Sequence, residues 1–545
     1  MGRFVIRSVL YGVIGYDIIE CIYREEYIPL QTEAMMKSLL DLLKTTESIK
    51  TEGNVNIPVS DITANSRHVT AGAVFICLKG ARVDGHAFAE EAAQRGAAAI
   101  VASEKISGFP GVTVVYVRDT RRAMEDMAPF FFDYPSRKMR MIGVTGTNGK
   151  TTTTHMVAHI LRTCGFKTGV IGTVHTLIGD VEYPAKNTTP DVIDLQRILQ
   201  TMAEKGVTHV CMEVSSHALV FGRIAGCEFD TAVFTNLTED HLDFHKTMDN
   251  YAKAKATLFA LVSEEKQVKQ GKHACINGDD PYASLMEGAV ADTNRCPIIT
   301  YGLEPSADLY AHNIHFTGNA SSFMIRYQSK EYQIHTKLAG RFNVYNALAS
   351  MASALAEGVG IEDAIHGLHS FASVPGRFEI IDEGQRFGVI VDYAHTPDGL
   401  ENILVTAREI TKGKVIVAFG CGGDRDRRKR PIMGQIAAEK ADIIFVTSDN
   451  PRTEDPKRII EDVLAGIQRE AEKKKTAQYY VYPKRREAIK KAVQAASDGD
   501  IVLIAGKGHE NYQILKDKTI HFDDREEARK AIRERINGII YSGRD

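Results

Sequence analysis

The sequence has no tryptophan and no Cys-x-x-Cys pair among its eight cysteines. A structural zinc site normally uses such pairs, and a disulfide framework needs cysteines concentrated in a short secreted chain. The scattered cysteines therefore predict neither kind of site. Free thiols are typical of a reducing compartment, so we expect a cytoplasmic protein.

A strong net charge and a long apolar segment are also missing. The formal net charge is -3, with 25% charged and 44% hydrophobic residues, which is an ordinary globular composition. Without an excess of positive charge, we expect no nucleic-acid partner. The apolar stretch 5–19 contains Arg7 and Asp17, is short for a membrane span and has no small-residue cleavage site. We expect neither a signal peptide nor membrane insertion.

Length and local patterning predict an α/β protein of three domains. A chain of 545 residues is too long for one ordinary core. A plausible amphipathic start follows Met36, so we expect residues 1–34 to be an extension outside the fold. Separately, we expect the chain to be a monomer. We place a small N-terminal α/β domain at 35–139, a central P-loop ATPase-like domain with a parallel sheet at 140–373, and a C-terminal Rossmann-like domain at 374–545.

Four short apolar runs of the last domain end in polar or glycine-rich loops. Such runs predict buried strands of a parallel sheet. Ligands of open α/β sheets bind beyond the carboxyl ends of the strands, so we expect the four loops to share one crevice. The runs are residues 389–391, 415–419, 443–446 and 501–504, and the loops follow at 392–395, 420–425, 449–452 and 506–510.

The segment from Gly143 to Thr152 has the features of a phosphate-binding loop. An apolar strand precedes it, and a helix-like stretch begins at Lys150. Its small residues let backbone N–H groups approach phosphate oxygens, Lys150 adds positive charge, and Thr151 can bind Mg²⁺. The spacing departs from G-x-x-x-x-G-K-[ST], because Val144 stands at the first glycine position. We predict nucleotide binding from the order of strand, loop and helix.

Two further residues are candidate ligands for a metal beside the nucleotide. Mg²⁺ prefers hard oxygen ligands, and Glu213 follows an apolar run that predicts a buried strand. His241 is a second possible ligand. Taken alone, Glu213 could cap a helix or pair with a cation, and His241 could be an ordinary surface or core histidine. Only their combination with the phosphate loop favours a metal site.

The sequence resembles the Mur ligase family, which couples ATP hydrolysis to amide-bond formation in peptidoglycan assembly. The run from Gly146 to Thr152 is similar to that family's own phosphate loop, which accounts for the unusual spacing. The similarity extends from about Ile62 to Gln513. It implies an N-terminal domain for a UDP-linked substrate, a central domain that uses ATP and Mg²⁺, and a C-terminal domain for the incoming amino acid.

The resemblance also assigns roles to individual positions. For ATP it implies contacts from Gly146, Thr147, Asn148, Gly149, Lys150, Thr151, Thr152, Asn343 and Asn346. For the UDP-muramoyl dipeptide it implies Ser66, Thr188, Thr189, Ser215 and Arg223, with Phe221 standing where some members have glutamine. It implies a catalytic group of Lys150, Glu213, His241 and Lys255, and metal ligands Thr151, Glu213, His241 and Lys255. Lys255 matches a lysine that the family carbamylates, which turns a cation into a carboxylate.

Simpler interpretations of these residues stay open. Ser66 and Thr188 could be turn residues, because serine and threonine favour turns. Lys255 could be a solvated helix residue, and Asn343 and Asn346 could cap a helix. The residues alone do not exclude these alternatives.

Within the family the chain most resembles members that add meso-2,6-diaminopimelate. This amino acid presents a second ammonium and carboxylate, whereas lysine presents only an ammonium, so a selective pocket needs a cation and an acid. Arg452 is expected to bind the distal carboxylate and Glu510 the distal ammonium. A surface salt bridge of Arg452 with Glu454 or Asp455 is the simpler alternative. The implied pocket contains Arg425, Asp449, Asn450, Pro451, Arg452, Gly506 and Glu510.

Other functions remain possible at this point. A lysine-adding ligase of the same family would differ at Arg452. A folylpolyglutamate or cyanophycin-type ligase would lack the 449–452 loop, and a P-loop switch would bind nucleotide without releasing phosphate. His217 or His395 could position a substrate or act as a base, and the sequence does not choose between them.

Overall fold

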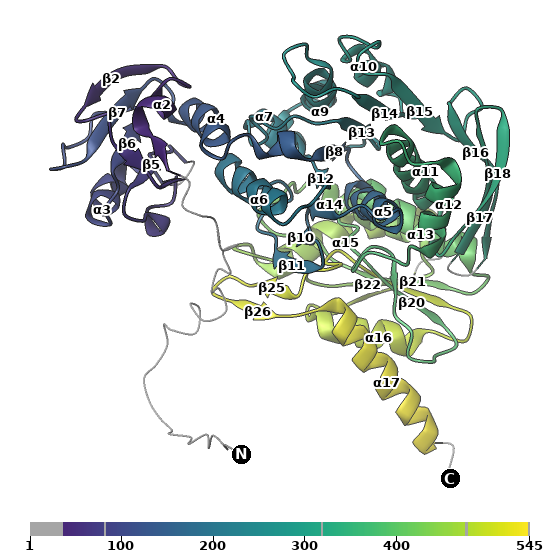
Figure 1. Cartoon of the computed structure of the whole chain (residues 1–545). Coiled ribbons are helices and arrows are strands. Elements are labelled where there is room, and N and C mark those ends of the chain that lie inside the picture. The colour runs from purple at the N-terminus through teal and green to yellow at the C-terminus, as the bar shows by residue number, and fades with distance from the viewer. Residues whose placement is uncertain (1–35, 81–82, 318–319, 475–477, 543–545) are drawn as a thin grey trace, which may run out of the picture.

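The computed structural model of the chain describes residues 36–80, 83–317, 320–474 and 478–542. The expected extension 1–34 lies outside these residues. The described chain forms three α/β parts, each built on its own main sheet (Figure 1). The first part lies at the upper left of Figure 1, the second at the upper right, and the third below them.

The N-terminal part is a five-stranded sheet in the order β2-β7-β6-β5-β4, with β2 antiparallel and the others parallel. Apolar side chains fill both faces, with α2 and α4 covering one and α3 the other. The bounds are α2 (Leu39–Leu43), β2 (Ser48–Glu52), β4 (Asp61–Thr63), β5 (Ala73–Ile76), α3 (Ala89–Gln94), β6 (Ala99–Ala102), β7 (Thr113–Val117) and α4 (Thr120–Phe131). A small pair, β1 (Lys37–Ser38) with β3 (Pro58–Val59), lies beside it.

The central part is an eleven-stranded sheet with a parallel middle and antiparallel strands at both edges. Its order is β11-β10-β9-β12-β8-β13-β14-β15-β16-β17-β18. The parallel sheet predicted for this region is therefore confirmed for its middle strands. The bounds are β8 (Arg140–Thr145), β9 (Thr168–Ile171), β10 (His175–Ile178), β11 (Val181–Pro184), β12 (His209–Glu213), β13 (Thr231–Phe234), β14 (His273–Asn277), β15 (Ile298–Gly302), β16 (Leu309–Thr317), β17 (Ala320–Tyr327) and β18 (Lys330–Thr336).

Helices cover both faces of the central sheet and enclose two apolar cores. One face carries α5 (Lys150–Thr163), α11 (Arg341–Ala356) and α12 (Ile361–Ser370). The other carries α6 (Val192–Glu204), α9 (Met248–Ser263) and α10 (Ala283–Gly288). Because β8 lies between β12 and β13, its buried residues hold the loop that follows it near the middle of the sheet.

The C-terminal part is a six-stranded sheet in the order β19-β20-β24-β21-β22-β23, parallel except for β19. Helices α13 to α15 pack on one face, and α16 and α17 on the other (Figure 1). The bounds are β19 (Glu379–Ile380), β20 (Gly388–Asp392), α13 (Pro397–Ile410), β21 (Val415–Phe419), α14 (Lys429–Lys440), β22 (Ile443–Val446), α15 (Pro456–Lys474), β23 (Gln478–Val481), α16 (Arg485–Ala495), β24 (Ile501–Ala505), β25 (Tyr512–Ile514), β26 (Thr519–His521) and α17 (Asp524–Ser542).

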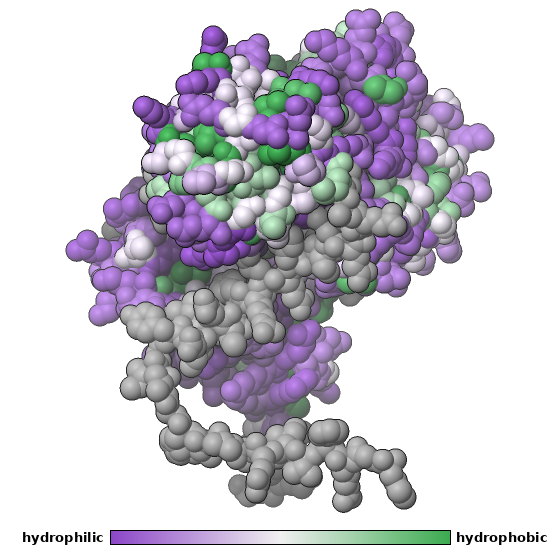
Figure 2. Space-filling view, turned by 60° about the vertical axis from the view of Figure 1, so that its left-hand side comes forward, coloured by the Kyte–Doolittle hydropathy of each residue, from purple (hydrophilic) through white to green (hydrophobic). Residues whose placement is uncertain are grey.

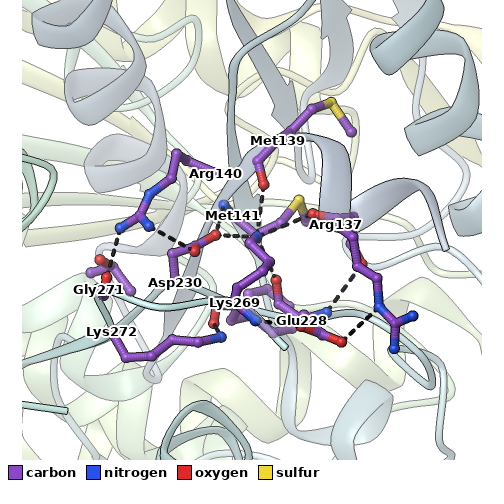
Figure 3. Close-up of polar contacts among 12 residues, drawn as sticks. Arg137, Met139, Arg140, Met141, Glu228, Asp230, Lys269, Gly271 and Lys272 are labelled. Atoms are coloured by element: carbon purple, nitrogen blue, oxygen red, sulfur yellow. Dashed lines mark hydrogen bonds and ion pairs between the residues drawn. The ribbon is translucent and has the colours of Figure 1, made fainter. Parts of the chain in front are cut away.

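A buried ionic cluster lies at the amino ends of the central strands, opposite the phosphate loop (Figure 3). The fully buried Asp230 pairs with Arg140 (2.9 Å) and with Lys269. The Lys269 ammonium also donates to the carbonyl oxygens of Ser136 (3.1 Å) and Met139 (2.7 Å). These two residues belong to the linker that joins the N-terminal part to β8, so Lys269 fastens that linker to the central part.

The surface visible in Figure 2 is mostly hydrophilic, with hydrophobic residues in small separate patches. Within the described residues, none of the helices combines the length and the apolar character that a membrane crossing requires. The seven cysteines in that part of the chain are all free thiols.

Candidate active site

The phosphate loop between β8 and α5 requires glycine at two positions. Gly146 and Gly149 have φ of +151° and +85°. A Cβ atom on Gly146 would lie 1.8 Å from the Thr235 hydroxyl oxygen, and one on Gly149 would lie 2.4 Å from Asn346 Oδ1. Both the backbone conformation and the close neighbours therefore exclude larger residues.

Lys150 begins α5 and folds back over the loop. Its ammonium donates to the carbonyl oxygens of Gly146 (2.8 Å) and Thr147 (2.9 Å). Burial lowers its pKa, while Glu213 and Asp240 oppose that shift. A phosphate group in the loop would give this cation the negative partner that the two carbonyl groups only partly replace.

The loop after β13 supports the phosphate loop from the side. The backbone N–H of Thr147 donates to the carbonyl oxygen of Asn236 (2.8 Å), and that of Asn148 to Asn236 Oδ1 (2.9 Å). The Asp280 carboxylate accepts the N–H of Leu237 (2.8 Å) and so anchors this supporting loop. These bonds fix the backbone of the phosphate loop at Thr147 and Asn148.

Lys255 is buried in α9, which excludes the solvated helix residue considered above. Its Nζ donates to the carbonyl oxygen of Gly146 (2.7 Å) and lies 4.4 Å from the ring centroid of Tyr251. Burial, reinforced by the charge of Lys150, lowers its pKa well below the usual lysine value. The neutral amine is thus much more accessible here than on a solvated lysine.

The candidate metal ligands supply hard donors beside the phosphate loop, but no ready-made cluster. Thr151, Glu213 and His241 line one cavity. The buried Glu213 carboxylate accepts from the N–H (2.8 Å) and hydroxyl (3.0 Å) of Thr173. In the described part of the chain, no three His, Cys, Asp or Glu side chains are arranged to hold a metal. The oxygens of Thr151 and Glu213 fit Mg²⁺, with substrate oxygens completing its shell, whereas the His241 nitrogen is a less usual ligand for this ion.

His241 has a left-handed backbone, with φ of +55°, at the start of α8 (Leu242–His245). Its Nε2 lies 3.4 Å from Asp240 Oδ2. Burial lowers its pKa to about 4, against the opposing effect of Asp240, so the ring is neutral at neutral pH. Neutral imidazole is the form that can bind a metal.

The residues expected to hold the acyl substrate meet around one threonine. The Thr189 hydroxyl donates to the carbonyl oxygen of Glu213 (2.8 Å), and the Arg223 guanidinium donates to the carbonyl oxygen of Thr189 (3.1 Å). Ser215, which caps α7 (Ser216–Val220), places its backbone N–H 3.1 Å from the Thr189 hydroxyl. Thr188 lies 3.0 Å from Thr173 through their hydroxyl groups, and it lines the cavity.

Ser66 lies in a different part of the molecule from these residues. It is buried in the 3₁₀ turn Ser66–His68 of the N-terminal part and donates to Glu91 Oε2 (2.8 Å). A turn residue was the simpler interpretation of Ser66, and the structure does place it in a turn. The structure thus separates Ser66 from the four central residues, so one ligand would have to extend between the two parts to contact both.

Asn343 and Asn346 lie within α11 and line the cavity, so they are not helix caps. The N-cap of α11 is Gly340. The Asn346 amide donates to Asn343 Oδ1 (3.2 Å), and the Asn343 amide donates to the carbonyl oxygen of Ala339 (2.8 Å). These bonds fix the orientation of both amides, and Asn346 Oδ1 lies beside Gly149 of the phosphate loop.

The cavity, of about 450 Å³, is walled by the central and C-terminal parts together. Arg377 donates through Nη2 to the Thr151 hydroxyl (3.0 Å) and lies 4.4 Å from the Tyr393 ring centroid. Asp398 of α13 accepts from the Asn148 amide (2.5 Å). Sequence reasoning missed Arg377 and Asp398 as site residues, because each meets a partner more than 200 positions away.

The structure places His395 on the cavity wall, whereas His217 does not line the cavity. Burial lowers the pKa of His395 to about 4, and nearby Lys429 acts in the same direction. His395 Nδ1 lies 2.9 Å from the carbonyl oxygen of Tyr393 and can donate to it, which leaves Nε2 as an acceptor. His217 stacks on Phe244, with 4.3 Å between ring centroids.

The four strand-end loops of the C-terminal part meet, as expected from parallel strands. The Asn450 amide donates to Glu510 Oε2 (2.8 Å). The Gly506 N–H donates to the carbonyl oxygen of Asp392 (3.0 Å), and the Arg452 guanidinium donates to the carbonyl oxygen of Gly423 (2.8 Å). A Cβ on Gly506 would lie 2.7 Å from the Asp449 carboxylate. These contacts bring Asp449, Asn450, Arg452, Gly506 and Glu510 together where the loops meet, and we call this group the strand-end crevice.

Arg452 does not form the surface salt bridge that was its simpler explanation. Glu454 pairs instead with the buried Arg430 (2.8 Å). The Asp455 carboxylate accepts from the backbone N–H of Lys457 (2.9 Å). Arg452 has a φ of +53°, an uncommon backbone conformation for an arginine. Of its guanidinium nitrogens, only Nη1 donates to the Gly423 carbonyl oxygen. Pro451 is buried beside it, whereas Arg425 is exposed.

Three family descriptions match successive regions of the chain. "Mur ligase family, catalytic domain" matches residues 58–131, "Mur ligase middle domain" matches 144–354, and "Mur ligase, glutamate ligase domain" matches 376–508. The middle match contains the phosphate loop, and the last contains the strand-end loops. Together the three matches cover more than half of the chain.

The chain is also similar, over most of its length, to proteins that carry a name. The UDP-N-acetylmuramoyl-L-alanyl-D-glutamate–2,6-diaminopimelate ligase of Geobacillus kaustophilus is 50% identical over 483 residues, covering 89% of this chain and 96% of that protein. A solved structure bearing the same name has a TM-score of 0.64 at 34% identity, covering 92% of this chain and 99% of that one. The MurF ligase of Thermotoga maritima, solved in complex with ADP, shares the fold with a TM-score of 0.60 at 19% identity over 87% and 96%.

Proposed function

Because the chain belongs to the Mur ligase family, we propose that it is the ATP-dependent ligase that joins 2,6-diaminopimelate to UDP-N-acetylmuramoyl-L-alanyl-D-glutamate in peptidoglycan synthesis. The observation that carries this proposal is one cavity with three kinds of wall. The phosphate loop forms one wall, Thr188 and Glu213 another, and Arg377, Tyr393 and His395 of the C-terminal part the third.

The reaction needs an activated carboxyl group and an attacking amine. We propose that the side-chain carboxylate of the D-glutamyl residue attacks the γ-phosphorus of ATP, forming an acyl phosphate and releasing ADP. The amine of diaminopimelate then attacks the acyl carbon, and phosphate leaves as the amide bond forms. Both steps build up negative charge, which fixed cations and N–H groups stabilise best.

Lys150 is proposed to stabilise the transferring phosphoryl group. Its ammonium already lies against the phosphate loop, held by two carbonyl groups. Arg377 reaches the same loop from the C-terminal part through Thr151. The ATP contacts proposed from the family resemblance, Gly146 to Thr152 with Asn343 and Asn346, are supported by their shared cavity and by the two glycine conformations.

Mg²⁺ is proposed to be held by Thr151, Glu213 and His241, with a carbamylated Lys255 nearby. The metal would neutralise charge on the phosphate oxygens. Carbamylation is favoured by the low pKa of the Lys255 amine, because the neutral amine is the form that adds to CO₂. A ¹³C NMR carbamate signal in protein kept with ¹³C-bicarbonate should disappear in Lys255→Ala. A signal that persists in the variant would assign carbamylation elsewhere.

The UDP-muramoyl dipeptide is proposed to extend from Ser66 to the residues around Thr189. The separation of Ser66 from Thr188, Ser215 and Arg223 supports this, because the substrate has a nucleotide at one end and a dipeptide at the other. Diaminopimelate is proposed to occupy the strand-end crevice. There Arg452 keeps free donors for a carboxylate, and Glu510 can meet an ammonium.

The domain limits 35–139, 140–373 and 374–545 remain proposals, as do a monomeric state and a cytoplasmic location. The three main sheets support the limits, because their strands fall within residues 48–117, 140–336 and 379–505. Sedimentation of the purified protein would test the monomer. A dimer at micromolar concentration would contradict it.

The function is tested by phosphate release with ATP, Mg²⁺ and UDP-muramoyl-L-alanyl-D-glutamate. Release should require an added amino acid, and meso-diaminopimelate should be used far better than L-lysine. Equal use of the two, or use of lysine alone, would refute diaminopimelate addition. Nucleotide binding without any phosphate release would refute the ligase itself.

A further inference from the structure

Lys507 lies beneath the strand-end crevice, and no step described above uses it. It follows β24 by two positions, and its side chain is fully buried. Its ammonium donates to Glu510 Oε2 (2.8 Å) and to Asn450 Oδ1 (3.2 Å). A lysine is almost never fully buried without a charged partner, so this arrangement is a specific feature of the site.

Asn450 completes a closed set of hydrogen bonds around Glu510. Its amide donates to Glu510 Oε2, and its carbonyl oxygen accepts from Lys507 and from the backbone N–H of Ile514 (2.9 Å). Glu510 Oε2 therefore has two donors, whereas neither bond uses Oε1. The Glu510 side chain keeps 13% exposure and Lys507 has none. A ligand in the crevice would therefore meet the carboxylate first, with the ammonium behind it.

Two buried or nearly buried ion pairs lie beneath the strand-end loops, and each pair is neutral. Arg485 and Asp524 form a fully buried pair (2.6 Å), and Arg485 also donates to the carbonyl oxygen of Ala505 (2.9 Å) at the end of β24. Lys507 and Glu510 form the second pair (2.8 Å), so the two pairs together add no net charge beneath the loops. Removing Lys507 would leave one uncompensated negative charge in a poorly solvated place.

This balance suits a neutral ligand head better than a cationic one. The distal end of diaminopimelate carries an ammonium and a carboxylate, so it adds no net charge. The distal end of lysine adds one positive charge beside Arg452 and Lys507. Charges interact more strongly in such partly desolvated crevices than in water, and selectivity often comes from a penalty on the wrong ligand.

We propose that Lys507 is a specificity-determining residue, which weakens the attraction of Glu510 for a lone ammonium and so favours a zwitterionic amino-acid head over lysine. The inference rests on the proposed function, in particular on Glu510 and Arg452 as the distal contacts. Glu510 then contacts the distal ammonium, and Arg452 binds the distal carboxylate. Lys507 keeps Glu510 alone from binding the lysine ammonium tightly.

The test compares diaminopimelate with L-lysine in Lys507→Met, through kcat/KM for phosphate release at saturating ATP and UDP-linked substrate. The diaminopimelate-to-lysine ratio should fall about tenfold or more, the scale of one lost charged interaction. Lys507→Arg should keep the ratio within about threefold, because it keeps the charge. Lys518→Met is the matched control, since Lys518 is an exposed lysine between β25 and β26.

Glu510→Gln provides an independent test in the opposite direction. It leaves Lys507 without its carboxylate, so the crevice gains net positive charge and the ratio should rise even though both activities fall. An unchanged ratio in folded Lys507→Met, judged by a wild-type melting curve and an unchanged KM for ATP, would overturn the proposal. If Lys507→Met does not fold, an unchanged or lower ratio in Glu510→Gln overturns it. Wild-type protein that fails to use diaminopimelate would instead overturn the proposed function.

Discussion

Two buried lysines of this protein have opposite surroundings. Lys255 has a carbonyl group as its hydrogen-bond acceptor and the cation Lys150 nearby, which lowers its pKa well below the usual value. Lys507 is hydrogen-bonded to the Glu510 carboxylate. The first environment favours a neutral, nucleophilic amine, and the second favours a fixed ion pair. One residue type thus serves two chemical purposes, which only its neighbours reveal.

Lys150→Ala should abolish turnover while leaving the fold intact. The substitution removes a cation that contacts the phosphate loop at two carbonyl groups, so kcat should fall by roughly a thousandfold, as for other groups that stabilise transition-state charge. Steady-state phosphate release measures the change. Lys105→Ala, at an exposed site of the N-terminal part, is the control. Activity within tenfold of wild type would remove Lys150 from the mechanism.

His155 should make stability depend on pH. Burial lowers its pKa to about 4, against about 6.5 in an unfolded chain, so the unfolded state binds the proton first as pH falls. The stability contribution is complete above pH 6.5 and is lost between pH 6.5 and 4. The loss is at most about 3.5 kcal/mol, from about 1.4 kcal/mol per pKa unit.

The same histidine donates from Nδ1 to the Thr151 carbonyl oxygen (2.8 Å) and lies 3.1 Å from His175 through Nε2. Urea unfolding of His155→Gln should therefore show a flatter decline below pH 6.5 than wild type. The exposed His315→Gln should keep the wild-type slope. Identical slopes for wild type and His155→Gln would contradict the assignment.

At the scale of elements, the turn from β8 into α5 depends on Gly149. In Gly149→Ala the left-handed backbone costs about 1 to 2 kcal/mol, and the new Cβ also displaces Asn346. We expect lower stability and a raised KM for ATP. Gly165→Ala is the matched control, because its φ of +87° is similar and nothing lies within 4 Å of the added atom. It should lose stability alone, and an equal rise in KM would contradict the role of Asn346.

The buried parallel strands could be predicted from the sequence, whereas the antiparallel edge strands were missed. Runs such as 140–144 and 501–504 are apolar on both faces, and the structure has β8 and β24 there. The hairpin strands β17 and β18 have one exposed face, and their pairing depends on register with a neighbour. Within β17, Phe323–Ile325 are all apolar in sequence although only Phe323 and Ile325 are buried, so no apolar-polar alternation marks this strand.

Site residues divide in a similar way. The phosphate loop could be predicted because its chemistry is local: small residues, a lysine and a helix start follow one another. Arg377 could not, because it lies next to a Pro-Gly junction and contacts Thr151 only after the chain has folded. The sequence could not decide between the two interpretations of Arg452, because Arg430 pairs with Glu454 only in the folded chain and no local pattern marks that competition.

For the whole molecule, the decisive contacts are those between the central and C-terminal parts. Asp398→Ala should weaken ATP binding, because the Asn148 amide loses its acceptor across the cavity. We expect KM for ATP to rise several-fold, up to about tenfold, as for the loss of a charged hydrogen bond. Glu409→Ala, on an exposed position of the same helix, should change nothing. In small-angle scattering with ADP, the radius of gyration should be larger for Asp398→Ala than for wild type, because one contact between the two parts is lost. Equal radii would contradict a role of this contact in holding the parts together.

Lys269 bears on how such an enzyme moves. Its ammonium donates to the carbonyl oxygens of Ser136 and Met139, so we expect the linker into the N-terminal part to bend little. At the junction 374–377, Arg377 contacts Thr151, which lies in the proposed nucleotide site itself. We therefore expect the first two parts to move together as one body and the third to move against them. Bound ATP would then also couple the central and C-terminal parts, so nucleotide binding and the relative position of these parts would depend on each other.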